Sequence, residues 1–498
     1  MSTPVPSLPT PLPTVEVSAG QSKAAAHVVL SRTPDSDGGP RFGSGGAEFT
    51  DDWASSVDLT GKAGEVRPAP VGSGARWVLG IGAGSSGDWL DAGAALVRAV
   101  HAKLDKDRPT ETVVQVEVPS EVEAADMAAF VRGLLLGGYR FTVTNDEPKP
   151  RLRGVRLVVS EADRRHEIAA VVRKEAALAG ATAFARDLAN APSNVKDPAW
   201  LARTSAKAAG KVPGLDAVIR DEKWLAANDF GGVLAVGEGS DRPPRLLELS
   251  WRPKNATGPH IVVVGKGITF DTGGISVKPA DGMHLMRTDM AGGAAVIGAL
   301  IAIARLGVPV RVTGLVPCAE NHISGSAYRP GDIVRHYGGR TTEVTNTDAE
   351  GRMVLADGLA YAGATLAPDV LIDVATLTGA MKVSLGLRTG GLFATDDDLA
   401  ARVTAAGKRV GEAWWRMPLL DEYADKVASE IADVRQCPPG PGGITAALFL
   451  REFVGDLPWA HLDIAGPARA ERVYDEVVPG ATGFAARTLV ELAESYVS

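Results

Sequence analysis

The sequence predicts an α/β protein of two domains, because short apolar runs alternate with helical runs along most of the chain. At 498 residues the chain is longer than one ordinary domain, so two folded units are the natural expectation. The run at 261–264 has no polar residue, as in a parallel strand that is covered on both faces. We therefore predict a small N-terminal α/β domain and a larger C-terminal α/β/α domain with a mixed, mainly parallel sheet.

The first 165 residues contain a tail and the smaller domain. Residues 1–14 carry prolines at 4, 6, 9, 11 and 13, which predicts a disordered Pro-rich tail. This tail has neither the basic start nor the unbroken apolar segment of a signal peptide. In the domain at 15–165 we expect strands and helices in alternation, with a loop at 36–46. The expected strands are 24–30, 76–81, 112–118 and 155–160, and the expected helices are 88–104 and 120–136.

The larger domain, 166–498, starts with a linking helix that we expect to run from about 160 to about 190. Short apolar or β-branched runs then predict strands at 246–250, 261–264, 311–316, 370–374, 391–395 and 460–464. Helical runs separate most of them, at 294–305, 354–364, 399–409 and 486–496. This alternation predicts a sheet with helices on both faces.

Charged residues follow the 261–264 strand in a pattern that indicates a site. The next 25 positions include Lys266, Asp271, Lys278 and Asp289, separated by Gly-rich turns. In open α/β sheets, ligands bind in the loops after the carboxyl ends of the strands. We therefore expect these four side chains to line a ligand site.

The stretch from Asn346 to Arg352 adds two more acids. If it is extended, the side chains at i, i+2 and i+4 point the same way, so Asp348, Glu350 and Arg352 would share one surface. Together with Asp271 and Asp289, the site would then hold four carboxylates, which repel one another unless cations lie between them. Two divalent cations would balance the four charges, and Lys266 could be a neutral amine ligand only after it has lost its proton.

Each of these residues also has an ordinary explanation. Asp289 could cap the helix that follows it, and Lys266 could extend from a strand end to solvent. The acids near 350 could form a solvated face with weak ion pairs. We favour a dinuclear metal site because seven suitable residues occur in two short blocks.

The two blocks and several others resemble the leucyl (cytosol) aminopeptidase family, whose signature is close to N-T-D-A-E-G-R. The similarity extends from about residue 186 to the C-terminus and includes ARDLANAPSN (185–194), SGSAYRPGDIV (324–334), ATLTGAM (375–381) and WAHLDIAG (459–466). Met353 stands where the family commonly has leucine. The resemblance implies that one metal is held by Lys266, Asp271, Asp289 and Glu350. It implies that the other is held by Asp271, Asp348 and Glu350, with Lys278 and Arg352 as catalytic residues that bind no metal.

The resemblance also implies an activity. It is the release of N-terminal residues from peptides by metal-activated water, with bicarbonate held at Arg352 as the general base. Mn²⁺ or Zn²⁺ would be the metals, with Co²⁺ or Mg²⁺ as further candidates. The family's substrate-lining positions correspond here to Met286, Asn346, Ala349, Thr376, Gly379 and Ala465. These residues favour Leu and similar apolar first residues. The resemblance further implies a homohexamer, whereas a cytoplasmic location is predicted because the sequence shows neither a signal peptide nor a membrane span.

Composition and other motifs bound the alternatives. The formal charge of −8 argues against DNA binding, although some bacterial members of the resembled family bind DNA. We expect no membrane span, because no run approaches ~20 consecutive apolar residues. A two-metal phosphatase or amidase could use the same acids, and a DNA-binding architectural protein with vestigial catalysis is a rival of another class.

Three further features are given ordinary interpretations. The segment Gly82–Gly87 matches G-x-G-x-x-G, but the nearest acid at a predicted strand end, Glu117, lies 30 residues after Gly87, so we discount a dinucleotide site. His284 has no partner at a metal-ligand spacing, and we interpret it as a loop or surface residue. Cys437 lacks an adjacent histidine, and we interpret it as structural.

Overall fold

The computed structural model describes residues 6–34, 39–107, 112–147 and 149–497. The chain divides into two compact units. The N-terminal unit comprises Ser7–Gly180 together with Glu471–Pro479, and the C-terminal unit comprises Ala181–Ala470 and the chain from Gly480. The division falls inside helix α4 (Ala162–Asn190), the helix in which the sequence-based boundary at 165 also lies.

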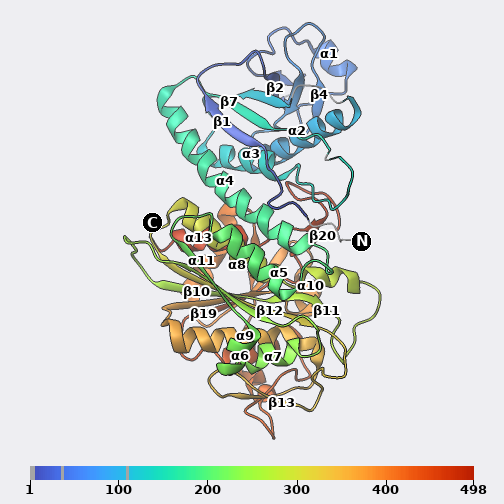
Figure 1. Ribbon diagram of the computed structural model, residues 1–498. Coiled ribbons are helices and arrows are strands. Elements are labelled where there is room, and N and C mark those ends of the chain that lie inside the picture. Colours follow the sequence, from blue (N-terminus) through green and yellow to red (C-terminus); the bar gives the residue numbers. More distant parts are fainter. Residues whose placement is uncertain (1–5, 35–38, 108–111, 148, 498) are drawn as a thin grey trace. The chain divides into compact units, whose positions relative to one another are not determined.

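The N-terminal unit is built on a sheet with the strand order β1-β7-β6-β2-β5-β4 (Figure 1). All neighbours from β1 to β5 are parallel, whereas β4 is antiparallel to β5 and the short β3 is antiparallel to β2. The strands are β1 (Thr14–Ser18), β2 (Ala26–Arg32), β3 (Arg41–Phe42), β4 (Val66–Pro68), β5 (Trp77–Gly80), β6 (Val113–Glu117) and β7 (Gly154–Val158).

The four strands predicted for this unit are confirmed as β2, β5, β6 and β7, whereas β1, β3 and β4 were not predicted. Of the predicted disordered tail, residues 1–5 lie outside the described residues, and Thr14 already begins β1, where it pairs with Gly154. Part of the predicted loop at 36–46 also lies outside the described residues, and its later part forms β3.

Two predicted helices of this unit are confirmed as α2 (Ser86–Asp107) and α3 (Ala124–Leu136), and a short helix α1 (Asp51–Ser56) precedes them. Helices α2 and α3 pack closely because each carries a glycine at the contact. A Cβ at Gly93 would lie 2.4 Å from the carbonyl oxygen of Phe130, and one at Gly133 would lie 2.2 Å from that of Leu90. Any larger residue would separate the helices and leave the unit's core less densely packed.

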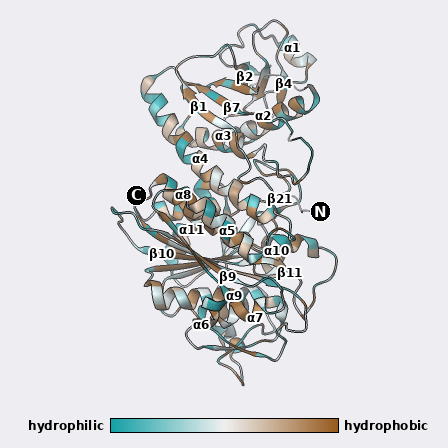
Figure 2. Cartoon of the chain, in the orientation of Figure 1, coloured by the Kyte–Doolittle hydropathy of each residue, from teal (hydrophilic) through white to brown (hydrophobic). Residues whose placement is uncertain are grey.

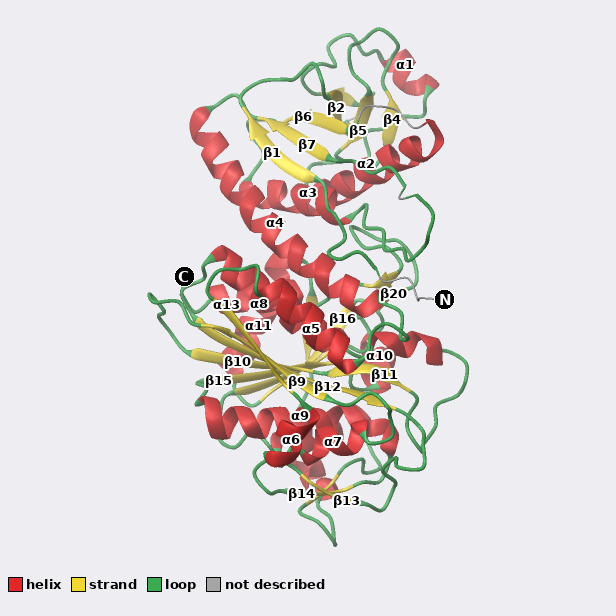
Figure 3. Ribbon diagram, viewed as in Figure 1, coloured by secondary structure: helices red, strands yellow, loops and turns green. Residues whose placement is uncertain are grey.

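The C-terminal unit contains a larger sheet with the order β17-β16-β19-β15-β10-β12-β9-β8, and β11 pairs with β12 (Figure 3). Its central strand β10 (His260–Gly265) is buried along its whole length and is parallel to both neighbours, β12 (Arg311–Asn321) and β15 (Val370–Ala375). The other strands are β8 (Leu215–Arg220), β9 (Arg245–Trp251), β11 (Gly267–Asp271), β16 (Thr389–Ala394), β17 (Ala413–Arg416) and β19 (Trp459–Asp463).

Helices cover both faces of this sheet (Figures 1 and 3). Helix α8 (Ala291–Leu306) packs on one face with α13 (Ala486–Glu494) and α11 (Asp397–Val410). Helix α9 (Glu350–Tyr361) packs on the other with α7 (Gly231–Gly237) and α12 (Gly442–Arg451). The predicted mixed, mainly parallel sheet between two helical layers is thereby confirmed. Shorter elements include α5 (Pro198–Ala209), α6 (Glu222–Ala227) and α10 (Gly379–Leu385).

Hydropathy follows these layers. Figure 2 shows hydrophilic and hydrophobic residues mixed within the individual helices, as expected for helices that bury only one side. Within the described residues, the run Met283–Leu306, which includes α8, is the one helical segment long and apolar enough to cross a membrane. Because 89% of its most apolar window is buried inside the protein, this segment has the character of a core helix.

Candidate functional site

The predicted site lies at the carboxyl end of the central strand of the C-terminal sheet. Lys266 follows β10 directly, and its backbone N–H donates to the carbonyl oxygen of Val374 at 3.0 Å, which keeps it in the sheet. Asp271 ends β11, opposite Asn321 at the end of β12. The position of both side chains is therefore set by the pairing of buried strands.

Lys266 is 3% exposed and lies among carboxylates. Its Nζ is 2.9 Å from Asp289 Oδ2 and 2.9 Å from Glu350 Oε1, and it donates to the carbonyl oxygen of Thr376 at 3.0 Å. Burial alone would lower the pKa of this ammonium, but the surrounding carboxylates, Asp289 foremost, outweigh burial and raise the pKa above its ordinary value. This environment excludes the interpretation of Lys266 as a lysine that extends to solvent.

Lys278 bridges a second pair of acids. Its Nζ is 2.8 Å from Asp271 Oδ2 and forms an ion pair with Asp348 as well. Its side chain is 20% exposed, so it is the more accessible of the two lysines. Burial lowers the pKa of Lys278, but Asp271 and the other acids outweigh burial and raise the pKa.

The stretch 346–352 is helical, so the prediction that it is extended is wrong. The side chain of Asn346 accepts a hydrogen bond from the N–H of Asp348 at 2.9 Å, which begins a 3₁₀ turn, η2 (Thr347–Ala349). Helix α9 then starts at Glu350. The Arg352 guanidinium donates to the carbonyl oxygen of Gln436 at 2.7 Å, so it does not join Asp348 and Glu350 on one extended surface as we expected.

The two acidic blocks meet all the same. Thr347 Oγ1 donates to the carbonyl oxygen of Gly273 at 2.7 Å and accepts from the N–H of Ser276 at 2.8 Å. Asn321 Nδ2 donates both to Asp271 Oδ1 at 2.8 Å and to the carbonyl oxygen of Thr347 at 3.0 Å. These hydrogen bonds hold the segment after β11 against the start of α9.

As a result, one oxygen each of Asp271, Asp348 and Glu350 lies within 4.8 Å of the other two. Burial, and secondly the charge of Asp271, raise the pKa of Asp348 to about 6 and that of Glu350 to about 7. Glu350 Oε2 is buried and has no hydrogen-bond partner among the described residues. A buried carboxylate oxygen without a partner is costly unless a cation binds it.

The donor set fits divalent cations. Four carboxylates face two lysine ammonium groups, so the acids exceed the positive charges held between them. Carboxylate oxygens suit hard and borderline divalent ions, and a neutral amine shifts the preference toward Mn²⁺, Co²⁺ or Zn²⁺.

Asp289 does not cap the following helix. The N-cap of α8 is Met290, and no side chain caps the helix there. The Asp289 carboxylate instead accepts hydrogen bonds from Lys266 Nζ and, at 2.7 Å, from Thr376 Oγ1. Burial raises the pKa of Asp289. The structure therefore places this acid in the site and supports the functional interpretation over the capping one.

Gly351 is required by the close approach of α9 to Lys266. A Cβ at this position would lie 2.5 Å from Lys266 Cε and 2.6 Å from its Nζ. A side chain at 351 would therefore push the amine away from Asp289 and Glu350.

Arg352 lies beside the acids but is bound elsewhere. Its guanidinium is buried, Nη1 donates to the carbonyl oxygen of Gln436 at 2.7 Å, and Nε has no partner among the described residues. Burial lowers the pKa of Arg352. A guanidinium with unused hydrogen-bonding capacity is suited to bind a small oxyanion.

The six predicted substrate-lining residues occupy four segments. Thr376 touches both Lys266 and Asp289, and Gly379, at the start of α10, faces open space. Ala465 is brought near this loop because Asp463 accepts hydrogen bonds from the N–H groups of Leu377, Thr378 and Ala465. Of the other three, Asn346 and Ala349 flank Asp348, and Met286 lies half-buried in η1 (Met283–Thr288).

Several supporting residues were missed from the sequence. Gln436 Oε1 accepts from the N–H groups of Thr345 and Asn346, at 3.1 and 3.0 Å, and its Nε2 donates to the carbonyl oxygen of Ala349 at 3.2 Å. Lys196 Nζ donates to carbonyl oxygens at the end of α4 and to that of Arg287, two residues before Asp289.

Only some of these residues carried a signal. Asn321 escaped notice because the strand that it ends was predicted to stop at 316. Asp463 lies in the WAHLDIAG block, which indicated it only as part of the resemblance. For Gln436 and Lys196 we find no signal in the sequence.

The other residues weighed from the sequence lie outside the acidic group. His284 is exposed in η1. Cys437 is half-buried, and its backbone N–H and carbonyl oxygen both bond to Thr345 Oγ1. Cys318 is buried in β12, where burial raises the pKa of its thiol. Neither cysteine forms a disulfide.

Comparison with known proteins places this geometry in context. A sequence model of the catalytic domain of the cytosol aminopeptidase family matches residues 183–490. A protein of Nocardia farcinica named "Probable cytosol aminopeptidase" is 44% identical over 458 residues, covering 89% of this chain and 88% of the relative. A protein of the same name from Syntrophotalea carbinolica is 41% identical over 453 residues, covering 88% and 90%.

Solved structures agree. The bottromycin maturation enzyme BotP in complex with Mn is 38% identical and superposes with a TM-score of 0.82, covering 95% of this chain and all of BotP. A further structure of BotP gives a TM-score of 0.81 at 37% identity.

Proposed function

Because the chain belongs to the cytosol aminopeptidase family and is accordingly a metal-dependent aminopeptidase, we propose that it releases Leu and similar apolar residues from the N termini of peptides. The observation that carries this proposal is the meeting of four carboxylates around two lysines at the end of the central strand. Further support comes from Glu350 Oε2, which has no partner among the described residues, and from burial, which together with the neighbouring charge of Asp271 raises the pKa of Glu350.

Two divalent cations per subunit would be held by the acids and by Lys266. One set of ligands would be Lys266, Asp271, Asp289 and Glu350, and the other Asp271, Asp348 and Glu350. We propose Mn²⁺ or Zn²⁺, with Co²⁺ or Mg²⁺ as alternatives, and the Mn in the similar enzyme BotP supports the first of these. Lys266 must lose its proton to bind a metal, so metal uptake would release protons.

When bound, the two cations supply an activated water at neutral pH and polarise the scissile carbonyl. Lys278 is the residue suited to stabilise the developing oxyanion, because its ammonium is partly exposed and its pKa is raised, so it stays charged. Arg352 would hold a bicarbonate that takes up the proton. Its buried guanidinium and its unpartnered Nε support this role.

Substrate choice would be set by the loops around Thr376. Small or apolar residues at Met286, Gly379 and Ala465 leave space for an apolar first side chain and offer no charged partner. Thr376 would line the pocket for the first side chain with them, and Asn346 and Ala349 would approach the second residue. Leu and Met substrates would therefore be favoured over Asp, Glu, Lys and Arg.

The test is hydrolysis of leucyl-anilide after chelation and re-addition of single metals. We expect chelation to abolish turnover and Mn²⁺ or Zn²⁺ to restore it. A phosphate monoester such as nitrophenyl phosphate is the parallel substrate, because a two-metal phosphatase would use the same acids. Restored phosphatase activity without peptidase activity would overturn the proposal.

Assembly, location and DNA binding are separate questions. We propose a cytoplasmic homohexamer, which light scattering would show as six times the 51.7 kDa chain mass.

The formal charge of −8 argues against DNA binding, and a gel-shift assay with a salt titration would detect such binding.

A further inference from the structure

The N-terminal unit contains a pocket of about 490 Å³ that has no part in the site described above. Its lining residues in the described part of the chain come from this unit, between Val28 and Arg164. Its volume is within the range of roughly 300–1,000 Å³ that is usual for small-molecule sites. Buried aliphatic side chains, among them Val28, Leu30 and Val159, form its apolar part.

The pocket lies at the point of the sheet where the direction of the chain connections reverses. The next strand of the chain that is parallel to β2 is β5, on one side of it, whereas the adjacent strand β6 is followed by β7 on the opposite side. Residues at the carboxyl ends of both strands, Arg32 and Glu117, line the pocket. In open parallel sheets, the crevice between two such strands is where ligands bind, nucleotides in particular.

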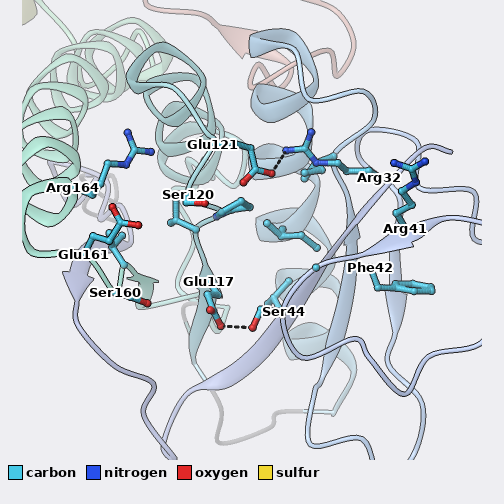
Figure 4. A pocket seen from close by; sticks show the side chains of 17 residues that line it. Arg32, Arg41, Phe42, Ser44, Glu117, Ser120, Glu121, Ser160, Glu161 and Arg164 are labelled. Atoms are coloured by element: carbon cyan, nitrogen blue, oxygen red, sulfur yellow. Dashed lines mark hydrogen bonds and ion pairs between the residues drawn. The ribbon is translucent and has the colours of Figure 1, made fainter. Parts of the chain in front are cut away.

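Two arginines face each other at the pocket. Arg32 on β2 is the direct cross-strand partner of Arg41 on β3, and Figure 4 shows both on the same side of the pocket. Like charges directly opposite each other destabilise a strand pair. Arg32 Nη2 is also 3.1 Å from Glu121 Oε1, but this carboxylate is 63% exposed and the pair is weak. An anion at the pocket would receive planar donors from both guanidinium groups.

The glycine motif at 82–87 has a structural reason here. Gly84 has a φ of +91°, and a Cβ on it would lie 3.1 Å from Arg32 Nη1. A residue with a side chain would therefore crowd the guanidinium at the pocket. Ile81, which immediately precedes the motif, lines the same pocket.

The opposite end of the pocket offers acceptors. Glu117 ends β6, and its Oε2 accepts a hydrogen bond from Ser44 Oγ at 2.7 Å, as Figure 4 shows. A carboxylate at the end of a strand next to such a crevice is suited to accept hydrogen bonds from ribose hydroxyls. Thus one cavity contains two arginines that can bind an anion, an apolar surface, and a carboxylate that can accept hydrogen bonds from hydroxyl groups.

We propose that this pocket binds a nucleotide, whose phosphate is held by Arg32 and Arg41 and whose sugar hydroxyls face Glu117. A phosphate suits two guanidinium groups better than a carboxylate does, because it offers more acceptor oxygens. The alternative occupant is an amino acid or dipeptide, whose carboxylate would bind the arginines and whose ammonium would bind Glu117.

The experiment is calorimetric titration of the full-length, metal-loaded protein with ADP, inorganic phosphate, adenosine and the dipeptide Leu-Leu. We expect saturable binding of ADP, and binding of phosphate and of adenosine at least about tenfold weaker, because each makes only part of the contacts. The double variant Arg32→Gln/Arg41→Gln should bind ADP roughly tenfold to a hundredfold more weakly, since it loses two charge-assisted interactions.

Two controls keep the outcome interpretable. Arg153→Gln removes one arginine just before β7, at the opposite ends of the parallel strands, and should bind ADP as the unmodified protein does. Leucyl-anilide turnover should be unchanged in the double variant, which would show that the loss of binding is local and that the ADP site is not the metal site.

The proposal is overturned if ADP does not bind or if the double variant binds it equally well. Binding of phosphate as tight as that of ADP would leave only an anion site and would reject a nucleotide. Arginine-dependent binding of Leu-Leu in place of ADP would identify a site for peptides or amino acids.

Discussion

Charged side chains lie at two strand ends of this molecule, and the two groups differ in their exposure to solvent. At the end of β10, Lys266 and the two acids that contact it, Asp289 and Glu350, are at most 7% exposed. At the end of β2, Arg32 is 34% exposed and its partner Glu121 is 63% exposed. The same parallel topology places both groups, but only the first is withdrawn from water.

This difference shows that burial changes both the pKa of a charged group and the free energy that it gains from binding a ligand. In the buried group the pKa of Glu350 rises to about 7, because water no longer stabilises the ionised form. A metal that binds there replaces missing stabilisation. The exposed arginines keep their hydration, so a ligand of that pocket gains less from each contact.

The largest effect that we predict is that of Glu350→Ala in the buried group. This variant removes a carboxylate that we assign to both metals, so leucyl-anilide turnover should fall by roughly a thousandfold or more. Circular dichroism should show the fold retained. Glu430→Ala, which removes an exposed acid of the same unit, is the matched control and should turn over normally. Normal turnover of Glu350→Ala would reject the assignment.

Lys278→Ala should be the next largest. Because we assign Lys278 to the oxyanion and not to a metal, kcat should fall by roughly a hundredfold to a thousandfold while metal content stays near normal. Metal analysis of the purified variant alongside its kinetics makes the distinction. Loss of metal in proportion to activity would show instead that Lys278 is needed to hold the metals.

Arg352→Ala should have a smaller effect, about tenfold to a hundredfold on kcat, since it positions a base and binds no metal. Arg352→Lys tests the geometry, because a lysine keeps the charge but not the planar fork. If added bicarbonate accelerates the unmodified enzyme and not the alanine variant, the role stands. An unchanged rate in Arg352→Ala would remove it.

The two units should respond to pH with opposite sign when metal is chelated. Between pH 4.5 and about 7 the folded C-terminal unit keeps a proton on Glu350 that the unfolded chain has lost, so its free energy of unfolding falls as the pH rises. In the N-terminal unit, burial lowers the pKa of His101 to about 4, from 6.5. Between these values the unfolded chain binds the extra proton, so the stability of this unit rises with pH.

Hydrogen exchange of helices α2 and α9, corrected for intrinsic exchange rates, measures the two slopes separately. His101→Gln should flatten the slope of the N-terminal unit and leave the slope of the C-terminal unit unchanged. If the free energy of unfolding changed with pH in the same direction in both units, the opposite effects assigned to the burial of Glu350 and of His101 would be contradicted.

The smallest effect on activity should come from Gly84→Ala at the exposed arginines. Turnover should not change, but the free energy of unfolding should fall by about 1 kcal/mol because the residue adopts a positive φ. Gly72→Ala is the control: its φ is +89°, and nothing lies within 4 Å of the added Cβ. An additional loss in Gly84→Ala would therefore report the contact with Arg32.

Much of this comparison could be predicted from sequence, for reasons that lie in particular residues. Continuous apolar runs such as 261–264 specify buried parallel strands, and Lys266 directly follows the strand that contains this run, while Asp271 ends the next strand. The local conformation at 346–352 could not be predicted by alternation, because the Asn346 side chain starts a turn that a period of two does not reveal. Spacing alone cannot distinguish the two conformations.

The pocket of the N-terminal unit was out of reach for a different reason. Its arginines lie in separate strands, and their direct opposition depends on the register of β3 against β2, a strand of two residues that no pattern indicates. The glycine motif was visible, but its contact with Arg32 requires the fold. Long-range pairing of short strands is therefore where sequence reasoning ends here.

The return of Glu471–Pro479 to the N-terminal unit has a consequence for synthesis of the protein. Arg98 in α2 donates to the carbonyl oxygens of Asp475 and Val477, at 2.6 and 3.4 Å. These acceptors leave the ribosome only when almost the whole chain has been translated. The unit made first is thus among the last to be completed, and a chain that is truncated by a premature stop codon before residue 471 would lack contacts in both units at once.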